Sequence, residues 1–452
     1  MKAPCHGAPQ AQTQEYAVSL FGAMNTAISG LTAQSAAFGN ISDNVANSQT
    51  VGFKRTDTAF IDYLTTSNAT TNDPGAVVAR PSYANTEQGT LSQTNNPLSM
   101  AITGQGFFPV SEAISTTAGT TSFSPQPYYS RAGDFKMNNN GYIVNSAGDF
   151  LNGWSVNSST NVVNRNTVAP IQVSQTVYNP VATTDVSLSA NLPATPTAGT
   201  PVSSQVDVYD ALGTAHPITL NWAQNAANDW TVSVNVPDDT TAAARGSAEV
   251  KFGALSGNPV PEGTVGSVGT PTGSVAAATY AANGAASLSF VTNFGNGPQT
   301  ITVGLGNFGQ SGGLTQYAGT AYSLHGLSQN GVPPGAFSSV STTSAGDVQV
   351  NYDNGQSRTI ARVPLVTFNN PDALQRNNGQ SFSATQASGT PLTQDAGTNG
   401  AGSLVTSSVE TSNVDIASEF SKLIVAQRAY SANTKMITTA DDLLQQTIDM
   451  KR

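Results

Sequence analysis

Two amphipathic patterns lie at opposite ends of the chain. Apolar residues recur near the N-terminus at alternating steps of four and three, which is the spacing of a coiled-coil helix. The positions are Leu20, Met24, Ala27, Leu31, Gln34, Phe38, Ile41 and Val45. The same spacing returns near the C-terminus at Ile416, Phe420, Leu423, Gln427, Tyr430, Thr434, Ile437, Asp441, Leu444 and Ile448. The pattern predicts two long helices that pair with each other, so that everything between them is an insertion.

The N-terminal helix has an unusual composition. Between Ser19 and Phe53 the only charged residue is Asp43. Three glycines lie inside the pattern, and each costs a helix about 1 kcal/mol relative to alanine; they are Gly22, Gly30 and Gly39. Short isolated helices of poor propensity are marginal in water. We therefore expect this segment to become helical only when it packs among copies of the chain, the alternative being a two-helix core element of an ordinary domain.

The C-terminal helix is expected to be the more stable of the two. Ser412 and Asp415 form a weak capping box before it. Its other face is predicted to be charged and solvated, with Glu419, Lys422, Arg428, Lys435 and Asp442.

The region between the helices is predicted to be β-structure. Apolar residues alternate with polar ones, as at Ile218, Leu220 and Trp222 and again from Trp230 to Val236. Turn-rich segments separate these runs, which favours an antiparallel meander with one solvated face. The fold class is therefore mainly β with terminal α-helices.

Composition limits the function. The 452 residues suggest about three domains. The chain has 17 basic and 27 acidic residues, a net charge of −10, and only 10% of its residues are charged. Proteins that bind the phosphate backbone need clustered Lys and Arg, so a nucleic-acid partner is not expected. No apolar run approaches the ~20 residues that cross a bilayer, so membrane insertion is not expected. A single cysteine, Cys5, excludes intrachain disulfides and CxxC zinc motifs.

Nothing in the sequence singles out catalytic chemistry. His6, His216 and His325 lack nearby partners of the kind that metal or triad sites use. The GxG at Gly104 and Gly106 is followed by two aromatics and a proline rather than by a helix, so a strand is expected there instead of a dinucleotide site. We therefore predict no enzyme activity and no catalytic, cofactor or metal site.

One twelve-residue segment, from Asp43 to Lys54, is a specific motif. It reads DNVANSQTVGFK. Asparagines suit the end of a helix, and Gly52 permits a sharp change of direction. Phe53 can then anchor the exit, and Lys54 lies near the negative end of the helix dipole.

This motif resembles the DN-[ILV]-AN-x-x-T-x-GFK signature of the flagellar rod and hook (axial) protein family. The matching residues are Asn44, Ala46, Asn47, Thr50, Gly52, Phe53 and Lys54. Further segments are similar to that family: AITGQGFF from Ala101, RAGDF from Arg131, VYDALGT from Val208, and SNVD with VAQRAY in the C-terminal region. The resemblance covers about residues 19–452 and is weakest within 160–330.

The resemblance implies a nested organisation of the chain. We expect a non-family extension at 1–18, an inner helical domain of 19–53 with 405–452, a connecting segment at 54–89, a discontinuous β-domain of 90–165 with 325–404, and an inserted outer β-domain at 166–324. The terminal helices would serve self-assembly through Leu20, Met24, Leu31, Phe38, Ile41, Val45, Ile416, Phe420, Leu423, Tyr430, Ile437, Leu444 and Ile448.

The resemblance also implies a function. The long insertion favours the hook branch of the family, a flexible curved tube that joins rod to filament and transmits torque. The implied partners are further copies of the chain, the flagellar rod, the hook cap, the hook-filament junction proteins and the type III export apparatus, and the implied location is the extracellular hook on the basal body. The alternatives are a distal rod protein, an extracellular β-rich adhesin, or an enzyme acting on polysaccharide.

Overall fold

The computed structural model describes residues 20–67, 72–117, 120–157, 160–196 and 202–450. The expected extension at 1–18 and the first residue of the expected helical domain, Ser19, lie outside these ranges. The chain divides into two units. The first comprises Met1–Ser174, Val340–Val350 and Arg358–Arg452, and the second comprises Gln175–Ser339 and Asn351–Ser357.

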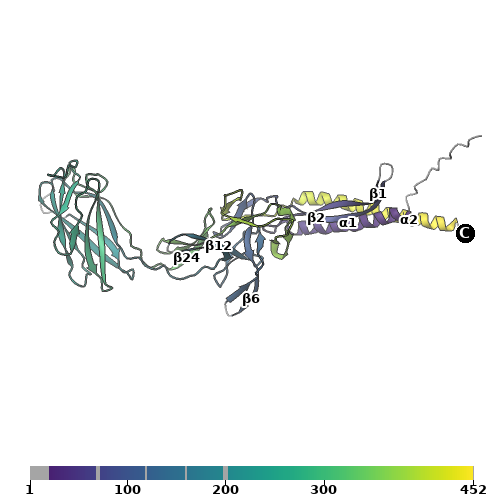
Figure 1. The fold of residues 1–452 in the computed structure, drawn as a ribbon, viewed down its shortest axis with the longest axis horizontal. Helices are drawn as coiled ribbons and strands as arrows, with labels where there is room; N and C mark the ends of the chain where they lie inside the picture. The colour runs from purple at the N-terminus through teal and green to yellow at the C-terminus, as the bar shows by residue number, and fades with distance from the viewer. Residues whose placement is uncertain (1–19, 68–71, 118–119, 158–159, 197–201, 451–452) are drawn as a thin grey trace, which may run out of the picture. The chain divides into compact units, whose positions relative to one another are not determined.

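The two ends of the chain form a pair of helices in the first unit, α1 (Leu20–Ala46) and α2 (Ile416–Asp449). Figure 1 shows the purple α1 and the yellow α2 side by side. A long hairpin, β1 (Thr56–Ser67) with β2 (Asn72–Tyr83), packs on α1. The backbone N–H of Val77 in β2 donates to Oγ of Ser29 in α1, 3.0 Å away, so a polar helix side chain satisfies an unpaired strand edge. The predicted fold class, mainly β with N- and C-terminal helices, is confirmed.

The rest of the first unit is built from short strands. The largest sheet of the described residues runs β24 (Phe337–Thr342), β25 (Asp347–Tyr352), β26 (Ser357–Arg362), β11 (Phe150–Val156), β5 (Phe108–Ser111), β8 (Tyr128–Ser130), β29 (Ser381–Ser383) and β28 (Gln375–Arg376), with β9 (Lys136–Met137), β10 (Ile143–Val144) and β12 (Val163–Pro170) off this path. Two short 3₁₀ turns are η1 (Pro371–Ala373) and η2 (Asn378–Gln380).

Small antiparallel pairs bring together segments that are remote in sequence. They are β3 (Leu91–Gln93) with β32 (Ser408–Glu410), β4 (Met100–Thr103) with β31 (Ser403–Thr406), β27 (Leu365–Thr367) with β30 (Leu392–Gln394), and β6 (Ala113–Thr117) with β7 (Thr120–Phe123). The first two pairs join the chain that enters the β-structure to the chain that leaves it for α2. Both halves of the first unit are therefore held in one fold across the insertion.

The second unit consists of two sheets around one apolar core. One sheet is an antiparallel meander of β14 (Val202–Tyr209), β15 (Ala215–Ala226), β16 (Asp229–Asn235), β17 (Ala244–Phe252) and β18 (Val265–Gly269). The other contains β19 (Val275–Ala277), β20 (Ala285–Asn293), β21 (Pro298–Asn307), β13 (Asp185–Asn191), β22 (Leu314–Thr315) and β23 (Ser323–Gln329). The alternation in β15 and β16 buries Leu220, Trp222 and Trp230, as predicted.

Two features of the second unit differ from the sequence-based expectations. β13 pairs in parallel with β21 and β22, so this sheet is mixed rather than purely antiparallel. The expected end of the inserted domain at residue 324 falls inside β23, which pairs with β13 along most of its length. Pairing with a strand at the start of the unit, which the local pattern does not reveal, holds β23 in this sheet.

Candidate functional site

The two terminal helices pair antiparallel. The Phe38 and Tyr430 rings meet edge to face with centroids 6.2 Å apart, and Asn44 hydrogen-bonds Glu419 at 3.0 Å. Gly30 lies against Asn433, because a Cβ built on this glycine would be 2.8 Å from Nδ2 of that asparagine. Glycine at this position therefore permits the close approach of the helices.

The predicted stripe on α1 faces the interior of the helical end. Ile41 is buried, and four more of its residues are half-buried: Met24, Leu31, Phe38 and Val45. The stripe missed Ala33, Ala37 and Asn44, which are also buried. Leu20 begins the described helix, and its side chain lies outside the described atoms.

The predicted stripe on α2 is only partly correct. Leu423, Ile437 and Leu444 are half-buried. Four others are exposed: Ile416 by 41%, Phe420 by 52%, Tyr430 by 42% and Ile448 by 64%. Of these four, Tyr430 still contacts Phe38. The expectation that Ile416, Phe420 and Ile448 belong to the intrachain contact is wrong.

The physical reason is the use of small residues. The buried positions of α2 are Ala426, Ala440 and Glu419, which are offset around the helix from the predicted stripe. Alanines let two helix backbones approach closely, so the helix rotates to present them. The large apolar side chains of α2 are left exposed, and they include Ile424, Val425, Met436 and Leu443 besides those of the predicted stripe.

The motif segment forms the joint between α1 and β1. Asn44 is fully buried; its Oδ1 accepts from the Thr56 N–H at 2.9 Å and its Nδ2 donates to the Thr56 carbonyl at 3.0 Å. Asn47 donates to the Asp43 carbonyl and carboxylate, and Thr50 donates to Asn47. These side chains satisfy the backbone where the helix ends and fix the direction of the strand that follows.

Gly52 and Phe53 anchor the joint to the β-structure. Gly52 has φ of 70°, and a Cβ there would lie 2.5 Å from the backbone N of Ala132. Both the backbone conformation and the space therefore require glycine. The Phe53 ring is buried, with the Arg376 guanidinium carbon 4.3 Å from its centroid.

Lys54 belongs to a buried ion cluster. Its ammonium is 2.6 Å from Oε1 of Glu410, and Nη1 of Arg131 is 3.2 Å from the other oxygen of that carboxylate. The three side chains are at most 2% exposed. Burial lowers the pKa of Lys54 and of Arg131, against the opposing effect of Glu410. The expected role of Lys54 at the helix dipole is therefore wrong, because its side chain turns inward to β32.

A second charge network connects α2 to the hairpin. Lys422 contacts Asp57 and is 2.7 Å from Glu419, and Arg55 contacts Asp57 at 3.0 Å and Glu87 at 2.9 Å. Burial alone would raise the pKa of Asp57, but hydrogen bonds from Lys422 and Arg55 outweigh it and hold the pKa below its usual value. Partial burial would lower the pKa of Lys422, but the hydrogen bonds to Asp57 and Glu419 raise it.

Glu419 and Asp415 differ from their predicted roles. Glu419, expected on a solvated face, is 1% exposed and joins Asn44 to Lys422. Asp415 is itself the N-cap of α2, and its side chain accepts from the N–H groups of Ala417 and Ser418. The predicted capping box of Ser412 with Asp415 is therefore replaced by a single capping aspartate.

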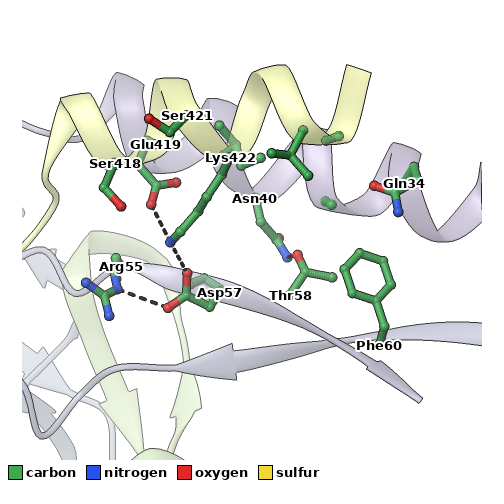
Figure 2. A pocket seen from close by; sticks show the side chains of 15 residues that line it. Gln34, Asn40, Arg55, Asp57, Thr58, Phe60, Ser418, Glu419, Ser421 and Lys422 are labelled. Atoms are coloured by element: carbon green, nitrogen blue, oxygen red, sulfur yellow. Dashed lines mark hydrogen bonds and ion pairs between the residues drawn. The ribbon is translucent and has the colours of Figure 1, made fainter. Parts of the chain in front are cut away.

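A groove of about 700 Å³ lies between α1, α2 and β1. Figure 2 shows Lys422 reaching from α2 toward Asp57 on β1, with Asn40 hydrogen-bonded to Thr58 and Phe60 at the far edge. Apolar side chains of the two helices line the remainder, namely Ala37, Ile41, Val425 and Ala426. The groove combines an apolar lining with ion pairs that are already satisfied, so it suits a protein segment better than a charged small molecule.

Sequence reasoning missed several residues of the joint. Glu410, Arg131 and Asn413 lie in or beside the quoted motifs, but their partners are remote in sequence. Asn413 accepts from the Arg55 N–H at 2.8 Å and donates to the carbonyls of Ala84 and Glu87. Local patterns carry no signal for such pairs; the motif matches at Arg131 and Asn413 were the only indication.

Cofactor and membrane sites can be assessed for the described residues. Within them, no group of three or more His, Cys, Asp or Glu side chains could hold a metal ion. None of the helices described is long and apolar enough to cross a membrane.

Four family models match consecutive parts of the chain. "Flagella basal body rod protein" matches 24–54, "Flagellar hook protein FlgE/F/G D1 domain" matches 101–191, "Flagellar basal body protein FlaE D2 domain" matches 176–332, and "Flagellar basal body rod FlgEFG protein C-terminal" matches 405–450. Together they define an axial protein of the flagellum.

Relatives match over nearly the whole length. The flagellar hook protein FlgE of Salmonella typhimurium is 30% identical over 440 residues, covering 94% of this chain and 99% of that protein. FlgE of Rhizobium meliloti is 29% identical over 96% of this chain and 100% of that protein. The solved flagellar hook protein FlgE2 of Helicobacter pylori matches 71% of this chain and 100% of that chain, with a TM-score of 0.47 and 13% identity. The chain belongs to the flagellar hook protein FlgE family.

Membership in this family assigns a structural role. The chain is a structural subunit of the hook, which is attached to the flagellar basal body. The distal rod alternative is not favoured, since the full-length relatives are hook proteins.

Proposed function

We propose that the subunit polymerises through its terminal helices into a flexible curved tube that joins rod to filament and transmits torque. Its immediate partners are further copies of the chain, and at its ends the rod, the hook cap and the hook-filament junction proteins. It reaches its site through the flagellar type III export apparatus and has no enzymatic activity. These statements extend the structural role that the family assigns.

The observation that supports this proposal is the surface of α2. Its large apolar side chains are exposed although the helix already has an intrachain partner. A monomer that left them in water would lose the free energy of burying them, about 1.5–3 kcal/mol for each large side chain. Contacts that do not close on themselves turn such surfaces into helical tubes. The predicted stripe residues Ile416, Phe420 and Ile448 are among the side chains available for these contacts.

Electron microscopy of the full chain at rising concentration tests the proposal. The wild type is expected to form short curved tubes. Phe420→Asp and Ile424→Asp are expected to remain monomeric and folded, because each places a carboxylate in a contact that forms only between copies. Leu212→Asp, which makes the same change at an apolar residue of the second unit that is 66% exposed, is the control and should still form tubes. Normal tubes from Phe420→Asp would contradict the assignment.

A further inference from the structure

A second apolar seam runs along the exposed side of α2. Four of its side chains are large and exposed: Val425 by 68%, Met436 by 57%, Leu443 by 52% and Met450 by 82%. With the intervening small and polar residues they follow alternating steps of four and three, at Val425, Ala429, Ala432, Met436, Thr439, Leu443, Gln446 and Met450. This is the spacing of a coiled-coil core, in which Ala429, Met436, Leu443 and Met450 are a positions.

The charges beside this seam have a regular order. Arg428, Lys435, Asp442 and Asp449 are each seven residues apart, and each directly precedes an a position, which makes them the g positions of the heptad. All four are exposed. In the described part of the chain none of them forms an ion pair, and their signs run plus, plus, minus, minus along the helix.

This charge order is complementary to itself in one orientation. When a second copy of α2 runs antiparallel, the g positions of the two helices face each other, and Arg428 meets Asp449 while Lys435 meets Asp442. The same alignment places Met436 opposite Thr439 at the centre of the pair. The outer core layers then follow as Leu443 with Ala432, Ala429 with Gln446, and Val425 with Met450.

A parallel arrangement does not give this match. In a parallel pair the g positions face the e positions of the partner. The e positions here are Ala426, Asn433 and Ala440, which are buried or half-buried and carry no charge. The charges would then remain unpaired. Charge complementarity therefore selects a second copy of the chain, in the antiparallel orientation.

We propose that two free subunits associate through this seam into an antiparallel dimer of their α2 helices. Each helix end reaches the groove of the other copy, because Val425 lines that groove and faces Met450 of the second copy in this register. The contact is the same on both subunits, so it closes on itself and cannot extend into a tube. The dimer thus competes with polymerisation and holds subunits in an unassembled form; only this consequence rests on the proposed function.

Sedimentation equilibrium of the full chain at low salt tests the dimer. Low salt is required because exposed charges are screened at higher ionic strength. Arg428→Glu with Lys435→Glu puts four negative charges on the stripe and is expected to weaken dimerisation at least tenfold. Adding Asp442→Lys and Asp449→Lys inverts the whole stripe and restores it. Asp441→Lys, an equal charge change on another exposed face of α2, is the matched control and should leave the dimer unchanged.

The orientation is tested by disulfide trapping in a Cys5→Ser background. Val425→Cys and Met450→Cys chains are mixed and oxidised; the antiparallel register predicts a mixed disulfide dimer. Dimers that resist the double reversal, or dimers without this disulfide, overturn the proposal. Tube formation, scored by electron microscopy, separates the dimer from the proposed function. A double variant that forms tubes but no dimers supports the proposal, whereas Phe420→Asp chains that dimerise but form no tubes leave both ideas standing separately.

Discussion

The second unit and the helical end of the first unit bury different kinds of side chain. The second unit encloses a continuous apolar core in which Leu220, Trp230 and Phe290 are at most 1% exposed. The helical end buries alanines together with Asn44 and Glu419, and it exposes the large apolar residues of α2. A unit with its own core can be stable alone. A helical pair held by small residues and polar networks keeps its apolar surface for contacts with other chains.

This comparison explains how one chain serves both folding and assembly. Buried apolar area is the main source of stability, so the second unit is self-sufficient. The helical end has specificity instead: Gly30, Asn44 and Glu419 fix how α1 and α2 meet, because a buried polar group without its partner is costly. The large apolar side chains then contribute only when copies assemble.

The largest expected effect is in the core of the second unit. Trp230→Ala should destabilise this unit by about 3–5 kcal/mol, because it removes a large buried side chain and leaves a cavity. Met436→Ala on α2, which is 57% exposed, should change the stability of the monomer by less than about 0.5 kcal/mol. Calorimetry of the full chain measures both. Equal losses from the two variants would remove the contrast between the regions.

The ion cluster at the joint should come next. Glu410→Gln leaves Lys54 and Arg131 buried without their counter-charge and should cost about 3–4 kcal/mol, confined to the first unit. The control is Glu249→Gln, which breaks a partly exposed pair with Lys251 in the second unit and should cost less than about 1 kcal/mol. Hydrogen exchange of β32 and β3 reports the local loss. If Glu410→Gln were as mild as its control, the joint would not depend on this cluster.

Acid should weaken the second unit through Asp239. Burial alone would raise the pKa of this carboxyl, but hydrogen bonds from Thr241, Thr292 and Asn293 outweigh it and hold the pKa well below its usual value. The ionised form therefore stabilises the folded unit above the unfolded pKa of about 4, and this contribution is lost as the pH falls toward the lowered folded value. Between pH 6 and pH 2 the loss should be on the order of 2 kcal/mol.

Asp239→Asn is the control for this pH dependence. The asparagine cannot ionise, so the variant should be less stable at pH 6 and should lose less on acidification. Thermal unfolding of the second unit at several pH values measures the difference. Wild type and variant with parallel pH profiles would show that another carboxyl is responsible.

Some of this architecture could be read from the sequence, and the reasons are physical. The alternation in β15 and β16 and the four-three spacing in α1 report burial that repeats with the local geometry of one element. The rotation of α2 could not be predicted, because its contact face uses Ala426, Ala440 and Glu419, which carry no apolar signal.

The joint was identified in part. The motif pointed to Asn44, Gly52 and Lys54, but Lys54 pairs with Glu410, which is 356 residues away. Long-range partners depend on how strands β3 and β32 meet, and no local pattern reports that. Similarly, the parallel pairing of β13 with β21 is set by the assembly of the whole sheet.

The smallest expected effects concern two glycines of α1. A Cβ on Gly39 would meet nothing within 4 Å, so Gly39→Ala should stabilise the helix by up to about 1 kcal/mol. Gly30→Ala gains the same propensity but must displace Asn433, so its net effect should be smaller or destabilising. Helix content by circular dichroism during thermal unfolding distinguishes them. A larger gain from Gly30→Ala would contradict the close helix contact.

Hydrogen exchange in free subunits and in assembled tubes tests the contrast between the two regions most directly. The account predicts that amides of α1 and α2 exchange at least a hundredfold more slowly in the tube, while the core amides of β15 and β16 are equally protected in both states. Helices protected in the free subunit as strongly as the core strands, with no gain on assembly, would contradict it.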